Sequence, residues 1–277
     1  MTHDRPITLS VAGTSKSLVW MPEATTWAAF VERLRVPVRG TETFTQYSRM
    51  TKAEQAKRKD TGGYVGGTLL GERRRKMDVT GRDLVTLDLD ALPEGGVNEV
   101  IARLDAFQCA WCIYSTRSHQ PARPRIRVII PLNETVTGEE YEPIARRLAE
   151  SVNLLWCDPT TFQAERMMYW PSACLDAEYR FEYRDKPLLN GHKILQSYTD
   201  WHDVRSWPTV PGTADEPRVS GAKKPDPTAK TGPIGAFNRS YTITEAMDAF
   251  LPGVYTPVEG DPNRFTYSGG STTGGAI

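Results

Sequence analysis

An alternation of short strand-like segments with helical stretches constrains the fold of this chain more than any other feature. Residues 84–91, LVTLDLDA, alternate apolar and polar side chains, which is typical of a strand with one buried face. Further strands are expected at 109–116, 125–132 and 167–170, and helices at 97–107 and 138–154. The resulting order, βαββαβ, predicts an α+β fold with a ferredoxin-like (RRM-like) core.

In a ferredoxin-like sheet the first strand lies between the fourth and the third, so distant parts of the chain meet at one edge. Asp88 and Asp90 end the first strand, and Asp158 precedes the fourth. We therefore expect these acids to lie near the polar residues that follow the second strand and begin the third, which are Ser118, His119, Arg125 and Arg127.

The residue types at this edge fit nucleotidyl transfer. Asp88 and Asp90 share one face of their strand, about 6.5–7 Å apart. They could hold two Mg²⁺ or Mn²⁺ ions with Asp158 as a third ligand, and the ions would activate the attacking hydroxyl and stabilise the leaving pyrophosphate. The two arginines of RIR share a face as well, and their guanidinium groups suit a triphosphate. The candidate nucleotide-binding residues are Ser118, His119, Arg125, Arg127 and Arg166.

Each of these motifs also has a purely structural interpretation. A lone Asp-x-Asp is commonly a solvated strand end, and Arg-x-Arg is commonly a solvent-facing strand. His119 could be a surface loop residue, and Asp158 could cap the turn DPTT. Cys109 and Cys112 point to opposite faces of a strand, so we expect them in the core rather than at a metal or redox site.

A basic segment precedes the first strand, in a chain whose net charge is zero. From Arg49 to Arg82 there are ten basic and four acidic residues, a net charge of +6. Glycines and a tyrosine interleave with them, which suits close backbone approach, base stacking and phosphate contacts. The alternative is a solvated helix followed by a hairpin. We predict that single-stranded DNA is bound by Lys59, Tyr64 and a strand that contains Arg73, Arg74, Arg75 and Lys76.

The chain is expected to divide into a main domain, a linker rich in proline, and the truncated start of a C-terminal helical or accessory region. No apolar run approaches the ~18 residues of a membrane span. The N-terminus also lacks a signal-peptide pattern, so we expect a cytoplasmic protein. The expected bounds are 1–200 for the main domain (N-terminal module 1–82, catalytic core 83–200), 201–233 for the linker and 234–277 for the accessory region.

Three blocks of the sequence, LVTLDLDAL, YSTRSHQPARPRIRVIIPL and WCDPT with RMMYWPS, resemble the archaeo-eukaryotic primase superfamily. The resemblance is to phage and plasmid primase-polymerases, which are often fused to a virulence-associated E type helicase. It runs from about Trp20 to Ser172 and includes KDTGGYVGG. The segment PIGAFNRSYTITEAMDAFLPGVYTP resembles the region that joins such primases to a downstream module.

The resemblance implies an N-terminal α/β module before the catalytic core. It also implies that Asp88, Asp90 and Asp158 bind metal and that His119 contacts the incoming nucleotide. The family has a small residue two positions before this histidine, whereas this chain has Arg117. The implied activity is a metal-dependent DNA primase-polymerase of a phage or mobile element, which uses nucleoside triphosphates (dNTP or NTP) on a single-stranded DNA template in the bacterial cytoplasm. A helicase domain or protein would act downstream.

Other classes are less consistent with the residues. A ferredoxin-like nucleotide cyclase would carry a second acidic motif where this chain has the basic SHQPARPR. A replication-initiator nuclease would need a His-hydrophobic-His metal site, and the four histidines have no such spacing. An RNA-recognition module would carry aromatic residues where Asp88 and Arg127 stand. The alternative that stays open is a non-catalytic ferredoxin-like nucleic-acid-binding module of a replication initiator.

Overall fold

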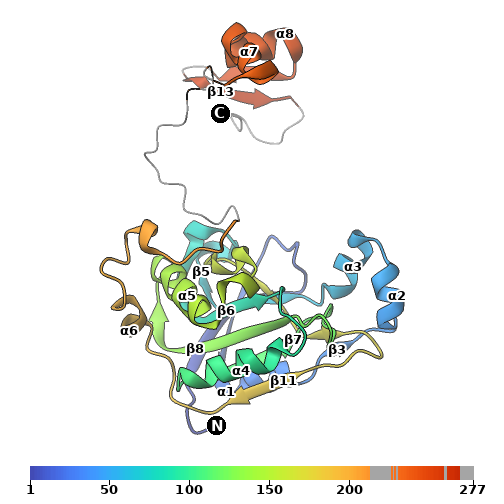
Figure 1. Cartoon of the computed structure of the whole chain (residues 1–277), viewed down its shortest axis with the longest axis vertical. Coiled ribbons are helices and arrows are strands. Elements are labelled where there is room, and N and C mark those ends of the chain that lie inside the picture. The colour runs from blue at the N-terminus through green and yellow to red at the C-terminus, as the bar shows by residue number, and fades with distance from the viewer. Residues whose placement is uncertain (213–225, 227, 229, 259–260, 269–277) are drawn as a thin grey trace. The chain divides into compact units, whose positions relative to one another are not determined.

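The computed structural model describes residues 1–212, 226, 228, 230–258 and 261–268 (Figure 1). The chain divides into two units, Met1–Arg218 and Val219–Ile277, and each is described by itself. Part of the predicted linker, residues 213–225, 227 and 229, lies outside the described residues.

The centre of the first unit is an antiparallel five-stranded sheet in the order β11-β7-β8-β6-β5. The α+β class is confirmed, and so is the expected adjacency of the first three core strands, since β8 lies between β6 and β7. Odd-numbered residues of β6 such as Leu87 pack with α4 and α5 in the larger core. These elements are β5 (Gly67–Leu69), β6 (Val79–Leu89), α4 (Gly96–Ala106), β7 (Trp111–Ser115), β8 (Ile126–Val136), α5 (Gly138–Val152) and β11 (Phe181–Arg184).

The expected fourth core strand is wrong in its position. Residues 167–170 contain β9 (Met168–Tyr169), which pairs with β4 (Gly63–Val65) in a second sheet of order β2-β1-β4-β9. The place beside β6 is taken by β5 instead. Glycine at position 67 permits this pairing, because a Cβ there would overlap the carbonyl oxygen of Gly81. Leu89 at the end of β6 forms a single antiparallel bridge with Cys157, which lies outside the predicted strand.

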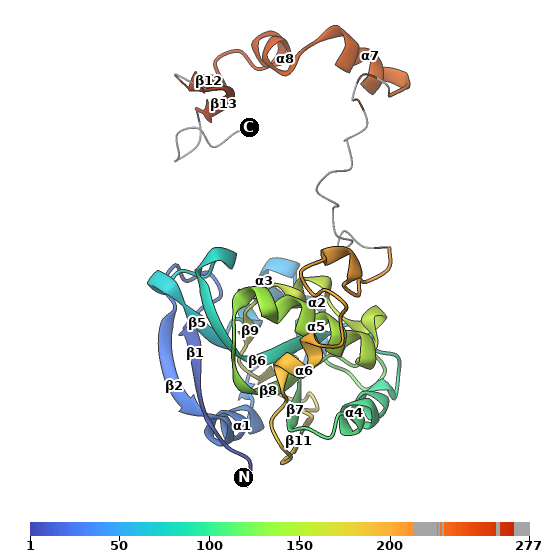
Figure 2. The same cartoon turned by 90° about the vertical axis from the view of Figure 1, so that its left-hand side faces the viewer.

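The N-terminal module covers the face of the central sheet that turns away from α4 and α5, and Figure 2 shows the central strands between these two layers. Buried residues of α1 at helical spacing, such as Trp27 and Phe30, pack against Leu84 and Ile129 of the central sheet. The sequence predicts one buried face for the strand 84–91, whereas residues 81–89 of β6 are buried on both faces. The elements of the module are β1 (Pro6–Ala12), β2 (Met21–Thr26), α1 (Trp27–Arg35), β3 (Val38–Arg39), α2 (Phe44–Arg49) and α3 (Lys52–Lys59).

Short elements complete the first unit. Residues 201–210, assigned to the linker from the sequence, pack on this unit: Arg146 of α5 donates to the carbonyl of Pro208 (3.0 Å), and Val210 is buried in the core. The domain bounds otherwise stay a prediction. The short elements are the 3₁₀ turns η1 (Leu70–Glu72), η2 (Lys76–Asp78), η3 (Leu154–Trp156), η4 (Pro159–Phe162) and η5 (Val204–Ser206), with β10 (Ser172–Ala173) and α6 (Gly191–Leu195).

The second unit contains a helix pair and a hairpin. Thr242 begins the second helix with a capping box that includes Glu245. The side chains of Phe237, Tyr241 and Phe250 contact one another through their rings. The elements are α7 (Gly232–Ser240), α8 (Ile243–Phe250), β12 (Tyr255–Val258) and β13 (Asp261–Tyr267).

Among the described residues, no helix is long and apolar enough to cross a bilayer.

Candidate active site

The acidic pair lies where β6 ends, on the face of the sheet that the N-terminal module covers. Asp88 is directly opposite Arg127 in the register of β6 and β8 and is 8% exposed. Asp90 follows the last residue of β6, and its side chain is 39% exposed. Alternation along β6 therefore produces the expected arrangement, with one deeply placed carboxylate and one near solvent.

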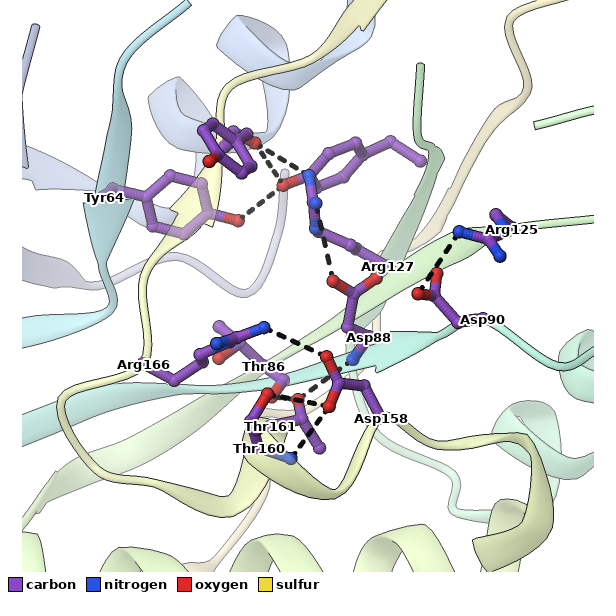
Figure 3. Close-up of polar contacts among 12 residues, drawn as sticks. Tyr64, Thr86, Asp88, Asp90, Arg125, Arg127, Asp158, Thr160, Thr161 and Arg166 are labelled. Carbon is purple, nitrogen blue, oxygen red and sulfur yellow. Dashed lines mark hydrogen bonds and ion pairs between the residues drawn. The ribbon is translucent and has the colours of Figure 1, made fainter. Parts of the chain in front are cut away.

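Each acid is paired with one arginine of the RIR motif, as Figure 3 shows. Arg127 Nη2 lies 3.5 Å from Asp88 Oδ2, and Arg125 Nη1 lies 3.4 Å from Asp90 Oδ2. Burial alone would lower the pKa of Arg127, but the negative charge of Asp88 raises it, and the net direction is upward. Arg127 therefore keeps its charge in the interior.

Arg127 is held from its other side by a chain of polar groups. Its Nη1 donates to the carbonyl of Tyr169 (3.1 Å), which also accepts the hydroxyl of Tyr114 (3.0 Å). The hydroxyls of Tyr114 and Tyr64 lie 3.1 Å apart. Tyr64 is fully buried, with Phe30 and Trp170 against its ring, so the prediction that it stacks on a template base is wrong.

The third acid, Asp158, contacts the acidic pair through its backbone and not through its carboxylate. Its N–H donates to the carbonyl of Asp88 (2.9 Å), but its carboxylate caps η4 by accepting from the backbone N–H of Thr160 (2.9 Å). The other carboxylate oxygen is 3.0 Å from Arg166 Nη2. Among the described residues there is no group of three His, Cys, Asp or Glu side chains placed to hold a metal ion. The role of Asp158 as a third ligand stays a prediction.

The electrostatics of the acidic pair favour a cation. Burial and then the negative charge of Asp88 raise the pKa of Asp90, although Arg125 opposes this. Asp88 Oδ1 is buried and has no hydrogen-bond partner among the described residues. Mg²⁺ is usually held by one or two carboxylates together with waters and substrate phosphates, so Asp88 and Asp90 fit such an ion without a third acid.

The two acid–arginine pairs line a small cavity of about 70 Å³, which we call the acid cavity. This volume suits an ion and its water rather than a whole nucleotide, since ligand pockets measure about 300–1,000 Å³. Lys59 lines it too and lies over the ring of Tyr169, 5.2 Å from its centre. Of the predicted site residues, the cavity brings together Asp88, Asp90, Ser118, Arg125, Arg127 and Lys59.

His119 lies in the loop between β7 and β8 and does not line this cavity. It is 4% exposed, and its Nδ1 accepts the backbone N–H of Arg125 (3.1 Å). Burial lowers the pKa of His119, although Glu178 opposes the shift. The ring is therefore neutral with its proton on Nε2, which leaves one N–H to donate. Contact with a nucleotide stays a prediction.

Arg117, which stands where the resemblance expects a small residue, forms a buried ion pair with Glu42. Its guanidinium crosses above Gly40, where a Cβ would overlap it, and it also lines the acid cavity. Burial alone would raise the pKa of Glu42, but the hydrogen bond from Arg117 lowers it in the net. The sequence showed the unusual arginine but not its partner, 75 residues away.

The basic segment after β5 is not a strand, so the expected alternation of residues 73–76 is wrong. Residues 73–75 lie between η1 and η2 without regular structure, and Arg73 and Arg75 are exposed. Arg74 lies over the ring of Trp20 (5.2 Å) and donates to the carbonyl of Glu165 (3.3 Å). Lys76 is 3.5 Å from Glu142. Their binding to DNA stays a prediction.

Replacing Arg125 with glutamine is expected to tighten Mn²⁺ binding to the nucleotide-free protein by up to about fivefold. The reason is that the guanidinium competes with the ion for Asp90, and an exposed pair is worth about 1 kcal/mol or less. Titration followed by electron paramagnetic resonance of free Mn²⁺ measures the change. Arg123→Gln, in the same loop but outside the acid cavity, is the matched control and should leave affinity unchanged. Weaker binding in Arg125→Gln would contradict the arrangement.

The fold and the site define an α+β protein with an acidic pair and an arginine pair at the end of adjacent strands. The chain belongs to the family described as the VapE N-terminal domain, which matches residues 1–210. This confirms the resemblance to proteins of the virulence-associated E type. A similar solved structure is the AEP domain of the cyanophage S-2L primase-polymerase, with 11% identity and a TM-score of 0.37, over 70% of this chain and 88% of that one. No curated protein sequence matches the chain.

Proposed function

We propose that this protein is a metal-dependent DNA primase-polymerase that transfers nucleotides from nucleoside triphosphates to a strand on a single-stranded DNA template. The observation that carries the proposal is the arrangement of two carboxylates and two arginines in one cavity, with a buried carboxylate oxygen of Asp88 left without a partner among the described residues. Membership of the VapE N-terminal family supports the same class. A helicase domain or protein acting downstream in the bacterial cytoplasm is part of this proposal.

The residues divide into those that hold an ion and those that hold phosphates. Asp88 and Asp90 would hold Mg²⁺ or Mn²⁺, and the ion would supply activation of the attacking hydroxyl and charge stabilisation of the leaving pyrophosphate. Arg127, fixed between Asp88 and the carbonyl of Tyr169, positions Asp88. Arg125 is half-exposed, and its guanidinium would be available to a triphosphate beside Asp90. Arg166 positions Asp158, and Ser118 offers a hydroxyl to a phosphate.

The second candidate is a non-catalytic nucleic-acid-binding module. The observation that favours it is that both acids are already paired with arginines, which would make the pairs structural. Incorporation of labelled nucleotide on primed and unprimed single-stranded DNA, with magnesium and with manganese, distinguishes the two. We expect incorporation with at least one of the ions. DNA binding with no incorporation under any of these conditions would favour the module.

His119 can be tested with substitutions that separate its two nitrogens. Glutamine places an N–H near the position of Nε2, whereas asparagine places an acceptor near Nδ1. If Nε2 donates to a phosphate of the incoming nucleotide, His119→Ala and His119→Asn should raise the KM for the triphosphate about tenfold or more, and His119→Gln should raise it much less. Template affinity should not change in any variant. Rescue by asparagine instead of glutamine would show that the contact with Arg125 is what matters.

A further inference from the structure

A second cleft of about 310 Å³ opens beside the acid cavity, between the helix pair α2–α3 and the loop that joins β7 to β8. Figure 1 shows α2 and α3 side by side at the end of the sheet. The cleft shares Ser118 and Arg125 with the acid cavity, so the two spaces are adjacent. Its other lining residues are Phe44, Tyr47, Ser48, Lys52, Gln55, Gln120 and Arg123.

The charge of the cleft selects an anionic ligand. Lys52 approaches from α3, and Arg123 and Arg125 approach from the opposite loop. Among the described residues, no aspartate or glutamate lines the cleft. Lys52 and Arg123 are exposed, which leaves their charged groups accessible to phosphates in solution.

Two aromatic residues of α2 form a wall of the same cleft. Phe44 is partly exposed, and its ring centre is 6.2 Å from that of Tyr47, whose hydroxyl lies 3.4 Å from Ser118 Oγ. The helices that carry and flank this wall are stabilised at their starts, because Thr43 and Thr51 close capping boxes at the starts of α2 and α3. Gln55 also bridges the two helices by donating to the carbonyls of Tyr47 (3.2 Å) and Met50 (3.1 Å).

We infer that this cleft binds single-stranded nucleic acid, with phosphates on Lys52 and Arg123 and a base against Phe44. A strand fits better than a free nucleotide, because the basic surface continues along α3 through the exposed Lys57 and Arg58. The inference deepens the proposed function, on which it rests, by placing the strand that reaches the acid cavity. It moves that strand away from Tyr64 and the segment 73–76.

The test is fluorescence anisotropy of a labelled oligothymidine against salt, with neither metal nor nucleotide present. Each phosphate contact to a single strand contributes about 0.7 to the slope of log affinity against log salt. Lys52→Gln/Arg123→Gln should therefore flatten the slope by about 1.4. The matched control removes two exposed cations of the other candidate surface, Arg73→Gln/Arg75→Gln, and should leave the slope unchanged.

Phe44 is tested separately, because stacking releases no counterions. Phe44→Ala should weaken binding at least about fivefold at every salt concentration, with the slope unchanged, and Phe44→Tyr should bind as the wild type does. Thermal unfolding of each variant confirms that the fold is intact.

Three results would overturn the inference. These are an unchanged slope in the Lys52/Arg123 variant, a flattened slope in the Arg73/Arg75 variant alone, and displacement of the oligonucleotide by excess nucleoside triphosphate without metal. The last result would show that the cleft holds a nucleotide. Failure of the proposed function is distinguishable from failure of this inference. If the wild type binds DNA through the cleft but incorporates no nucleotide, the proposed enzymatic activity is wrong and the assignment of the cleft as a DNA-binding site still holds.

Discussion

Replacing Asp88 with asparagine is expected to abolish nucleotide incorporation, with a loss of at least about 10³-fold. Asparagine keeps the size of the side chain and one oxygen, but removes the negative charge that would hold an ion. The buried Oδ1 of Asp88, without a hydrogen-bond partner among the described residues, is the atom whose chemistry the change alters most. Incorporation on primed single-stranded DNA at saturating Mg²⁺ and at saturating Mn²⁺ measures the effect.

Stability must be followed in the same variant, because Asp88 is a buried partner of Arg127 and not a surface carboxylate. Removing one partner of a buried pair can cost about 3–5 kcal/mol. Asp90→Asn is the companion variant, since the side chain of Asp90 is half-exposed and its loss leaves Arg125 in contact with water. We expect the same loss of incorporation in Asp90→Asn with little change in Tm. Full activity in either variant would show that Asp88 and Asp90 do not both bind an essential metal ion.

The alternation of residues 84–91 was enough to predict the strand and its apolar face, and the expected strand order predicted β8 as one of its neighbours. The pattern did not predict that the other face is buried as well, under the N-terminal module. The pairing of β6 and β8 is uninterrupted from Leu84 to Leu89, and it places Asp88 directly opposite Arg127. The predicted site residues on these two strands therefore lie close together, as expected. The same argument failed for 167–170, because a two-residue strand has no periodicity that would choose between two sheets.

The environment of Tyr64 could not be predicted for a related reason. It lies in β4, a strand of three residues, and the sequence GGYVGG resembles an exposed, flexible loop as much as a buried strand. Its burial depends on Phe30 of α1 and Trp170 after β9, which no local pattern connects. The glycines around it serve the close packing of strands, as at Gly67, rather than an approach to DNA.

A large loss of stability is expected when the buried ion pair of Arg117 and Glu42 is broken. Glu42→Gln should destabilise the protein by about 3 kcal/mol, because it leaves a buried guanidinium without a counter-charge. For a unit of this size the loss corresponds to a fall in Tm of about 6–12 °C. The matched control is Glu32→Gln, which removes the partner of Arg35 in an exposed pair and should cost less than about 1 kcal/mol.

A double variant decides why this chain has an arginine two residues before His119. Apolar residues can replace a buried ion pair with little loss of stability, so Glu42→Leu/Arg117→Met should recover most of what Glu42→Gln loses. Arg117 also lines the acid cavity, and its second possible role is a contact with the triphosphate. We expect the double variant to keep incorporation within about tenfold of the wild type, because the guanidinium of Arg117 is paired with Glu42 and with neither acid of the pair Asp88 and Asp90. A stable double variant with a strongly raised KM for the nucleotide would instead make Arg117 part of the binding site, and the ion pair with Glu42 would then be what orients it there.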